Sequence, residues 1–157
     1  MTNQAADALT LRIERTIRAP RERVYHAWVD PEEMKKWSAP PGMTIPEGLQ
    51  DLRVGGKFRA VMLEADGTQH IAVGEYREVT PPSRLVYTHA WIRNNGTSSE
   101  TTVETIVTVE FFEEEGKTRV VLTQTGFDNV AARDGHVGGW SGVFDKFVKL
   151  LEGDAQS

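Results

Sequence analysis

The residues of this sequence best suited to acid–base chemistry are its four histidines. Among them, His89 alternates with Tyr87 and Trp91 along a segment typical of a strand. A histidine in an apolar cleft titrates near neutral pH and can transfer a proton, so His89 and Tyr87 are the candidate catalytic residues. The alternative is a structural histidine with both ring nitrogens hydrogen-bonded by neighbours.

The remaining polar candidates have simpler interpretations. His26 lies among charged residues and His70 follows a turn signal, so we expect both to be exposed. Arg15 interrupts the apolar side of a predicted strand, where it either reaches an acidic group or extends to the sheet edge. Glu104 is expected to point to solvent.

The sequence offers little for a metal or cofactor. It contains no cysteine, and no histidine stands at a ligand-like spacing from another histidine or forms a ligand set with a carboxylate. Cysteine thiolates and clustered histidines and carboxylates are the usual ligands of zinc and iron. We therefore expect a protein without a metal or cofactor.

Composition limits the partners and the compartment. The 157 residues include 18 Lys and Arg and 23 Asp and Glu, for a net charge of −5, which argues against a nucleic-acid partner. The N-terminus lacks the features of a signal peptide, and no apolar stretch is long enough to insert into a membrane. With no cysteine, these features predict one cytoplasmic domain over residues 1–157, with a core at about 9–152.

Periodicity predicts an α+β fold. A strand at 9–18 is followed by two short helices that begin at Pro20 and at Asp30-Pro31 and stop at 39–42. Further strands are expected at 44–52, 58–64, 69–79, 84–92, 101–112 and 118–125, with a type I′ turn at Asp66-Gly67 and another turn at 94–96. After a loop at 126–135, an amphipathic helix from near Gly138 to near Leu151 needs a sheet to cover.

Four local motifs, in order along the chain, carry a family resemblance. They are Ala19-Pro20 with Val24, Trp28, Asp30-Pro31 and Trp37; Val54-Gly55-Gly56-Lys57-Phe58; Val79-Thr80-Pro81-Pro82-Ser83-Arg84-Leu85; and Gly126-Phe127 with His136, Gly139 and Trp140. From Leu11 to Leu151 the chain resembles the SRPBCC superfamily, also called START or birch-pollen-allergen-like. The motifs are similar to those of its branch related to the activator of the heat-shock-protein-90 ATPase.

The resemblance implies a helix-grip fold, in which a curved antiparallel sheet of about six or seven strands wraps around the last helix. The concave face would line a ligand cavity, with Tyr25 in its far wall and His136 near its mouth. The implied ligand-binding residues are Trp28, Trp37, Phe58, Tyr76, Tyr87, His89, Trp91, Val107, Val109, Leu122, Gln124, Trp140 and Phe144. A register error of one residue would reverse the face on any strand.

Three functions remain open. The first is a domain that binds a small hydrophobic molecule between mostly apolar walls. The second is an enzyme of cyclase or hydrolase type that uses His89 or Tyr87 in the same cavity, and the third is a protein-interaction module like the co-chaperones of the branch. An enzyme predicts a polar cluster in the cavity, and an interaction module predicts a filled interior with an exposed apolar patch. A homodimer also remains open.

Overall fold

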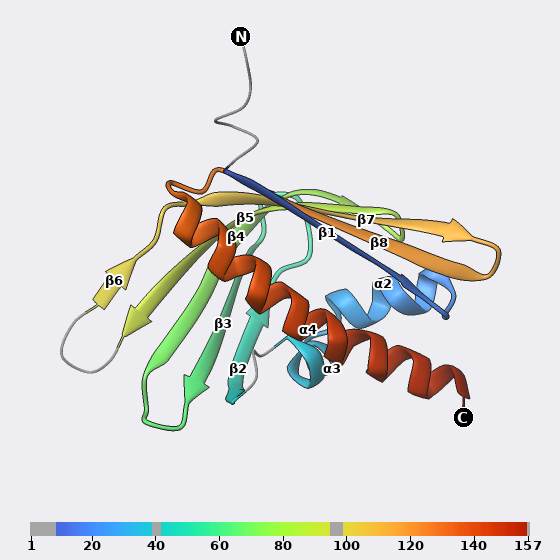
Figure 1. Cartoon of the computed structure of the whole chain (residues 1–157), viewed down its shortest axis with the longest axis horizontal. Coiled ribbons are helices and arrows are strands. Elements are labelled where there is room, and N and C mark those ends of the chain that lie inside the picture. The colour runs from blue at the N-terminus through green and yellow to red at the C-terminus, as the bar shows by residue number, and fades with distance from the viewer. Residues whose placement is uncertain (1–8, 39–41, 95–98, 157) are drawn as a thin grey trace, which may run out of the picture.

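The computed structural model describes residues 9–38, 42–94 and 99–156 (Figure 1). Its elements follow one another as β1 (Thr10–Ile17), α2 (Arg21–Val29), α3 (Pro31–Trp37), β2 (Met43–Gln50), β3 (Lys57–Glu64), β4 (Gln69–Thr80), β5 (Arg84–Asn94), β6 (Ser99–Thr101), β7 (Thr105–Glu114), β8 (Lys117–Thr125) and α4 (Val130–Gln156). The predicted helix stop at 39–42 and turn at 94–96 lie mostly outside the described residues. No helix in the described ranges has the length and apolarity needed to cross a bilayer.

The strands form one antiparallel sheet that confirms the predicted α+β helix-grip architecture. Its eight strands have the order β1-β8-β7-β5-β4-β3-β2, and β6 pairs with β5. β5 joins the two parts of the sheet. On one side its residues from Arg84 to His89 pair with β7, and on the other side β4 pairs with β5 along almost the whole length of β5. In Figure 1, β1, β7 and β8 run one way and β2 to β4 turn away, with the helices on one side of the sheet.

The two short helices begin where the sequence predicts. Pro31 occupies the first turn of α3, and the Asp30 carboxylate accepts a hydrogen bond from the Glu33 backbone N–H at 3.3 Å. Such a cap satisfies one of the backbone donors that a helix leaves free at its start. α2 buries Val24, Tyr25 and Trp28 against the sheet, so the apolar spacing seen in the sequence faces the core.

The hairpin predicted at Asp66-Gly67 is confirmed, since β3 and β4 pair on either side of it, but its turn is not of type I′. The Gly67 backbone N–H donates to the Glu64 carbonyl at 3.0 Å, and Gly67 has a φ of 92°. Glu115 is the one described non-glycine residue with a positive φ, so Asp66 keeps an ordinary backbone conformation. The Asp66 carboxylate stabilises that conformation by accepting from the Thr68 N–H at 2.9 Å.

The strand predicted at 101–112 is confirmed as β7, but it begins later than predicted, since β6 ends at Thr101 and β7 begins at Thr105. Between them, the Thr102 hydroxyl accepts a hydrogen bond from the Trp91 backbone N–H at 2.9 Å. A side chain that takes this ladder position interrupts the regular pairing. Glu104 lies in the interruption and is exposed, as expected.

The final helix begins eight residues earlier than predicted, at Val130 rather than near Gly138. The Asn129 side chain caps it by accepting from the Ala132 N–H at 2.7 Å. Gly135 and Gly138 indicated a loop because each interior glycine costs a helix about 1 kcal/mol relative to alanine. The cap at one end and the packed C-terminal half at the other keep these turns helical.

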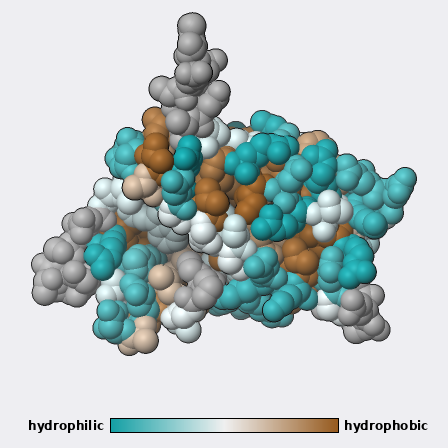
Figure 2. Space-filling view, in the orientation of Figure 1, coloured by the Kyte–Doolittle hydropathy of each residue, from teal (hydrophilic) through white to brown (hydrophobic). Residues whose placement is uncertain are grey.

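The C-terminal half of α4 fills the core. Phe144, Phe147 and Leu151 are fully or almost fully buried. The Phe147 ring contacts those of Trp37 and Trp28, with centroid distances of 4.6 and 5.3 Å. On the face in view in Figure 2, hydrophobic residues gather near the centre and hydrophilic residues cover most of the rim.

Replacing Phe147 by alanine should destabilise the protein strongly, because the ring is completely buried and leaves a cavity. We expect a loss of about 3–5 kcal/mol in the free energy of unfolding, or roughly 6–20 °C in melting temperature. Thermal and urea denaturation measure this loss. Lys149→Ala, at an exposed position of the same helix, should stay close to wild type. A Phe147→Ala variant as stable as wild type would contradict this docking of α4.

Candidate functional site

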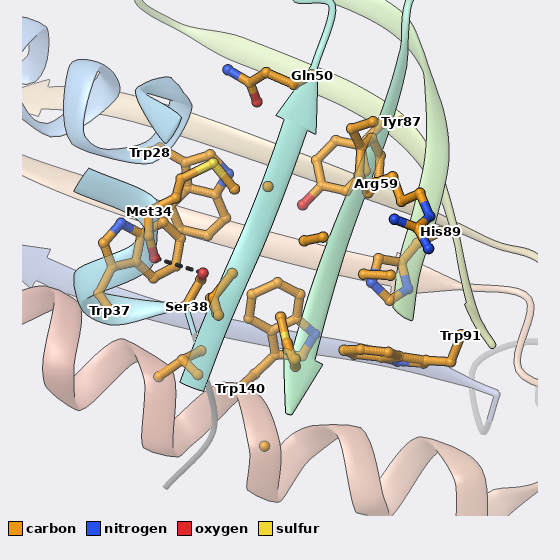
Figure 3. Close-up of a pocket in the computed structure, with 18 of the residues that line it drawn as sticks. Trp28, Met34, Trp37, Ser38, Gln50, Arg59, Tyr87, His89, Trp91 and Trp140 are labelled. Carbon is orange, nitrogen blue, oxygen red and sulfur yellow. Dashed lines mark hydrogen bonds between the residues drawn. The ribbon is translucent and has the colours of Figure 1, made fainter. Parts of the chain in front are cut away.

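A cavity of about 480 Å³ lies between the β2–β5 half of the sheet, the two short helices and the N-terminal half of α4 (Figure 3). The exposed side chains of Leu49, Lys35 and Arg59 are among its lining, so it opens to solvent beside them. The residues that line it are Trp28, Pro31, Met34, Lys35, Trp37, Ser38, Ile45, Gly48, Leu49, Gln50, Phe58, Arg59, Ala60, Met62, Ala72, Tyr76, Leu85, Tyr87, His89, Trp91, Ala131, Ala132, Gly135, His136, Gly139, Trp140 and Val143.

β5 supplies one wall of the cavity. Tyr87, His89 and Trp91 all line it, which confirms the predicted register of this strand. Figure 3 shows the three side chains on one side of the cavity, opposite Trp28 and Trp37. The His89 ring lies edge-to-face against Trp91, with ring centroids 5.1 Å apart. Alternation along one strand therefore places two aromatic rings and an imidazole side by side.

A turn with two glycines positions the neighbouring rings. Gly55 has a φ of 85° and donates its N–H to the Tyr76 carbonyl at 2.8 Å, while the Tyr76 N–H donates to the Gly56 carbonyl at 2.9 Å. Phe58 follows this turn, and its ring lies over Gly74, where an added Cβ would come within 2.5 Å of it. A side chain at residue 74 would clash with the Thr88 backbone carbonyl of β5 as well as with the Phe58 ring, so glycine is required here for both to keep their places.

The opposite wall is built from tryptophans with satisfied N–H groups. Trp28 stacks on Trp140 at an interplanar angle of 16° and contacts Trp37 at 4.7 Å between ring centroids. The Trp37 N–H donates to the Ala27 carbonyl at 2.9 Å, and the Trp140 N–H donates to the Gln124 side-chain oxygen at 2.8 Å. With these donors occupied, the rings offer the cavity apolar faces.

Eight of the predicted site residues line the cavity, and the other five do not. Trp28, Trp37, Phe58, Tyr76, Tyr87, His89, Trp91 and Trp140 belong to the lining. Val107, Val109, Leu122, Gln124 and Phe144 lie outside the lining and are buried in the core, as is Tyr25, whose ring contacts Phe111. The strand faces were predicted correctly, but on β7 and β8 the concave face is packed in the core, where α2 contacts both strands and Phe144 and Phe147 of α4 join the same cluster.

Gln124 has a structural role. It accepts from Trp140 and donates to the Thr105 hydroxyl at 2.8 Å, and this hydroxyl donates to the His89 carbonyl at 3.1 Å. A buried amide must find partners for its donor and acceptor, and here it joins α4 to β7 and β5. The predicted ligand contact of Gln124 is replaced by this chain of hydrogen bonds.

β2 and α3 contribute lining residues that the sequence analysis missed, including Met34, Ser38, Ile45, Leu49 and Gln50. The Gln50 side chain donates to the Val29 carbonyl and accepts from the Tyr76 hydroxyl at 3.0 Å. β2 is weakly patterned in sequence because it is an edge strand whose alternation is shifted by an irregularity between Thr44 and Glu47. The one sequence signal that could have indicated these lining residues was the helical spacing of Met34 and Trp37, which places both on the apolar side of α3.

Burial controls the ionisation of the polar lining. It lowers the pKa of His89 to about 4, with a smaller contribution from His136, so the ring is neutral at pH 7. Burial and the neighbouring Tyr76 raise the pKa of Tyr87, whereas the hydrogen bond from the Trp28 side chain acts in the opposite direction. The cavity thus presents neutral hydrogen-bonding groups and a base much weaker than an ordinary histidine.

The other histidines have protein partners. His136 lies in α4 and not in a loop before it. Its Nδ1 contacts the Ala132 carbonyl at 2.7 Å, and its Nε2 accepts a hydrogen bond from the Trp91 side-chain N–H at 3.1 Å. A second hollow of about 260 Å³ shares Trp91, His136 and His89 with the cavity. His70 is half-buried and pairs with Glu64, so its predicted exposure is wrong.

His26, Asp30 and Glu33 lie together at the start of α3, with candidate ligand atoms within 4.8 Å of one another. This grouping corrects the expectation that no histidine has such carboxylate neighbours. Arg23 already pairs with Glu33 at 2.8 Å, so the cluster is an ion-pair network on the surface. His26 is exposed, as expected.

Arg15, which interrupts the apolar side of β1, does not reach a carboxylate. Its guanidinium donates to the Glu14 carbonyl at 2.9 Å and lies 6.0 Å from the centre of the Phe144 ring. A cation over an aromatic face can remain partly hydrated while its stem covers apolar surface. This geometry agrees with the second of the two interpretations of Arg15.

A curved sheet that grips a long helix and leaves a lined cavity defines the class of this protein. Residues 18–152 match the family described as Activator of Hsp90 ATPase homolog 1-like protein. The chain belongs to this family, which confirms the resemblance found in the sequence motifs. No curated protein matches the chain.

Solved structures with the same fold are similar over nearly the whole chain. Protein CV1439 from Chromobacterium violaceum is 28% identical, with a TM-score of 0.77 over 91% of this chain and 97% of that chain. A protein from Rhizobium leguminosarum is also 28% identical, with a TM-score of 0.78 over 91% and 93% of the two chains. The AHSA1 (SPO3351) protein from Silicibacter pomeroyi, at 22% identity, shares the fold with a TM-score of 0.80 over 92% and 99%.

The lowered pKa of His89 should make stability depend on pH. Between its ordinary value of 6.5 and about 4, the unfolded chain binds a proton at His89 that the folded protein does not. The stabilisation is therefore complete above about pH 6.5, and the free energy of unfolding falls toward pH 4 by up to about 1.4 kcal/mol per pH unit.

Urea denaturation of wild type and His89→Leu across this range measures the effect. The leucine variant removes the titrating group, so its stability relative to wild type should rise as the pH falls. Proton NMR of the folded wild type should show no titration of the His89 ring above about pH 5. A midpoint near 6.5 would contradict the buried, neutral imidazole.

Proposed function

We propose that this protein binds a small, largely apolar molecule in the cavity, with Tyr87 and His89 contacting one polar end of the ligand. The observation that carries the proposal is the cavity itself, about 480 Å³ in volume and walled mainly by aromatic and aliphatic side chains. Ligand pockets typically combine such walls with a few placed polar groups. The cytoplasm is the proposed compartment, in keeping with a chain without cysteine.

The cavity favours this proposal over a protein-interaction module. A module that acts only through its surface has no need of an interior hollow, and close packing is the normal state of a protein interior. Here a hollow lies between the β2–β5 part of the sheet and the N-terminal half of α4, with Trp28, Trp140 and Phe58 in its lining. Because a void forfeits contacts on its lining, a cavity of this size is best accounted for by an occupant.

The polar lining favours binding over acid–base catalysis. With its pKa lowered to about 4, His89 is a weak base at neutral pH, and the raised pKa of Tyr87 makes it a weak acid. Among the described residues that line the cavity there is no carboxylate to strengthen either group. Hydrogen bonding to a ligand uses both side chains in the states that their surroundings favour.

Nile red, an uncharged dye whose fluorescence rises in apolar surroundings, tests the proposal. Titration of wild type should give a saturable signal with one site per chain. Trp91→Ala should weaken binding by about 1 kcal/mol, roughly fivefold, because it removes part of the wall. Thr108→Ala is the control, because Thr108 lies between Val107 and Val109 and alternates to the other face of the sheet. A linear, non-saturable signal from wild type would refute the proposal.

A further inference from the structure

Two glycines of α4 face the cavity with nothing against them. Gly135 and Gly139 both belong to the lining, and a Cβ added at either would meet no described atom within 4 Å. They lie one turn apart on the helix face that also carries Trp140. Close packing therefore does not require glycine here, although glycine weakens a helix. What their absent side chains leave is room along the cavity, at its exposed edge beside Gly135 and beside the half-buried Gly139.

A second observation points to what fills that room. His89 is 8% exposed and lines the same cavity, yet among the described residues neither of its ring nitrogens has a hydrogen-bond partner. Two other polar groups of the wall are engaged within the protein, since Tyr76 donates to Gln50 and Trp91 donates to His136. A buried polar group without a partner is costly, and a ligand's hydrogen-bonding group would satisfy it.

The charges around the cavity limit the ligand further. Lys35 and Arg59 are exposed at the mouth, and Lys35 pairs with Glu32 at 3.4 Å. His89 lies deeper, between the Phe58 and Trp91 rings, where no charged side chain of the described lining is buried with it. A charged group at this depth would lose its hydration without gaining a counter-ion.

We propose that the cavity takes an uncharged ring compound with one hydrogen-bonding group, anchored at His89, and that Gly135 and Gly139 determine the size of ring system it accepts. The flat rings of Trp28, Trp140 and Phe58 offer stacking surfaces to such a body, and the bare backbone of the two glycines leaves space for its width. This inference rests on the proposed function, because it describes the occupant of the same cavity.

Two naphthalene compounds test the charge and the anchor. 2-Naphthol is uncharged at pH 7.5 and carries one hydroxyl, whereas 2-naphthoate has the same rings and a negative charge. In displacement of Nile red, we expect 2-naphthol to bind wild type at least about tenfold more tightly than 2-naphthoate. His89→Leu should weaken 2-naphthol about fivefold, the size of one lost hydrogen bond, and should change 2-naphthoate less. Equal affinities of wild type for the two compounds would overturn the limit on charge, and a 2-naphthol affinity that His89→Leu leaves unchanged would overturn the anchor.

Leucine substitutions test the glycines, because leucine favours a helix and adds bulk. Gly139→Leu and Gly135→Leu should reduce Nile red affinity at least about tenfold while reducing 2-naphthol affinity less, since the smaller ring system needs less width. Gly138→Leu is the matched control, because Gly138 lies outside the lining and its added Cβ also meets nothing. It should leave both affinities unchanged, and none of the three variants should lower the melting temperature.

The outcomes separate the two proposals. Saturable binding by wild type that is equally strong in Gly135→Leu and Gly139→Leu would overturn the role of the glycines and leave the proposed function standing. An equal loss in Gly138→Leu would also overturn it, because a substitution outside the cavity would then act like one inside. Wild type that binds neither Nile red nor 2-naphthol would overturn the proposed function and this inference together.

Discussion

The position of Trp140 decides how much of the sheet is core and how much is cavity. Its N–H donates to the buried Gln124, and its ring stacks on Trp28, so α4 is attached to the sheet and to α2 at one residue. Beyond Trp140, the buried Phe144, Phe147 and Leu151 pack as an ordinary core. Before it, the same helix borders open space. One hydrogen bond between the half-buried Trp140 and the buried Gln124 thus marks where close packing stops.

The polar groups of the concave face follow from the same division. On the covered half, the buried Gln124 donates to the buried Thr105 hydroxyl, so both polar groups have partners within the protein. On the open half, His89 retains unpaired ring nitrogens and a pKa lowered to about 4. Burial without a partner is unfavourable for an imidazole, whereas burial beside a ligand would not be. The unpaired group therefore lies where an occupant could compensate for it.

From the sequence alone, the side of the sheet that a strand residue faces was predicted better than the elements that pack against that side. Alternation placed Tyr87, His89 and Trp91 on the concave side correctly, because a strand with one buried face shows it in every second residue. The family resemblance placed Val107, Val109 and Leu122 on the concave side as well, yet they do not reach the cavity. Which half of a sheet a helix covers depends on contacts between residues far apart in the chain, and periodicity carries no information about them.

The start of α4 shows the other limit of local reasoning. Gly135, Gly138 and Gly139 indicate a loop, and a helix of this composition would be unstable in isolation. It forms because Asn129 caps it and Trp140 anchors it, so the fold stabilises what the local sequence does not. Sites where local preference and global structure disagree are where function is expected. Here the disagreement lies on the helix turns that border the cavity, and the same glycines that misled the prediction leave its interior open.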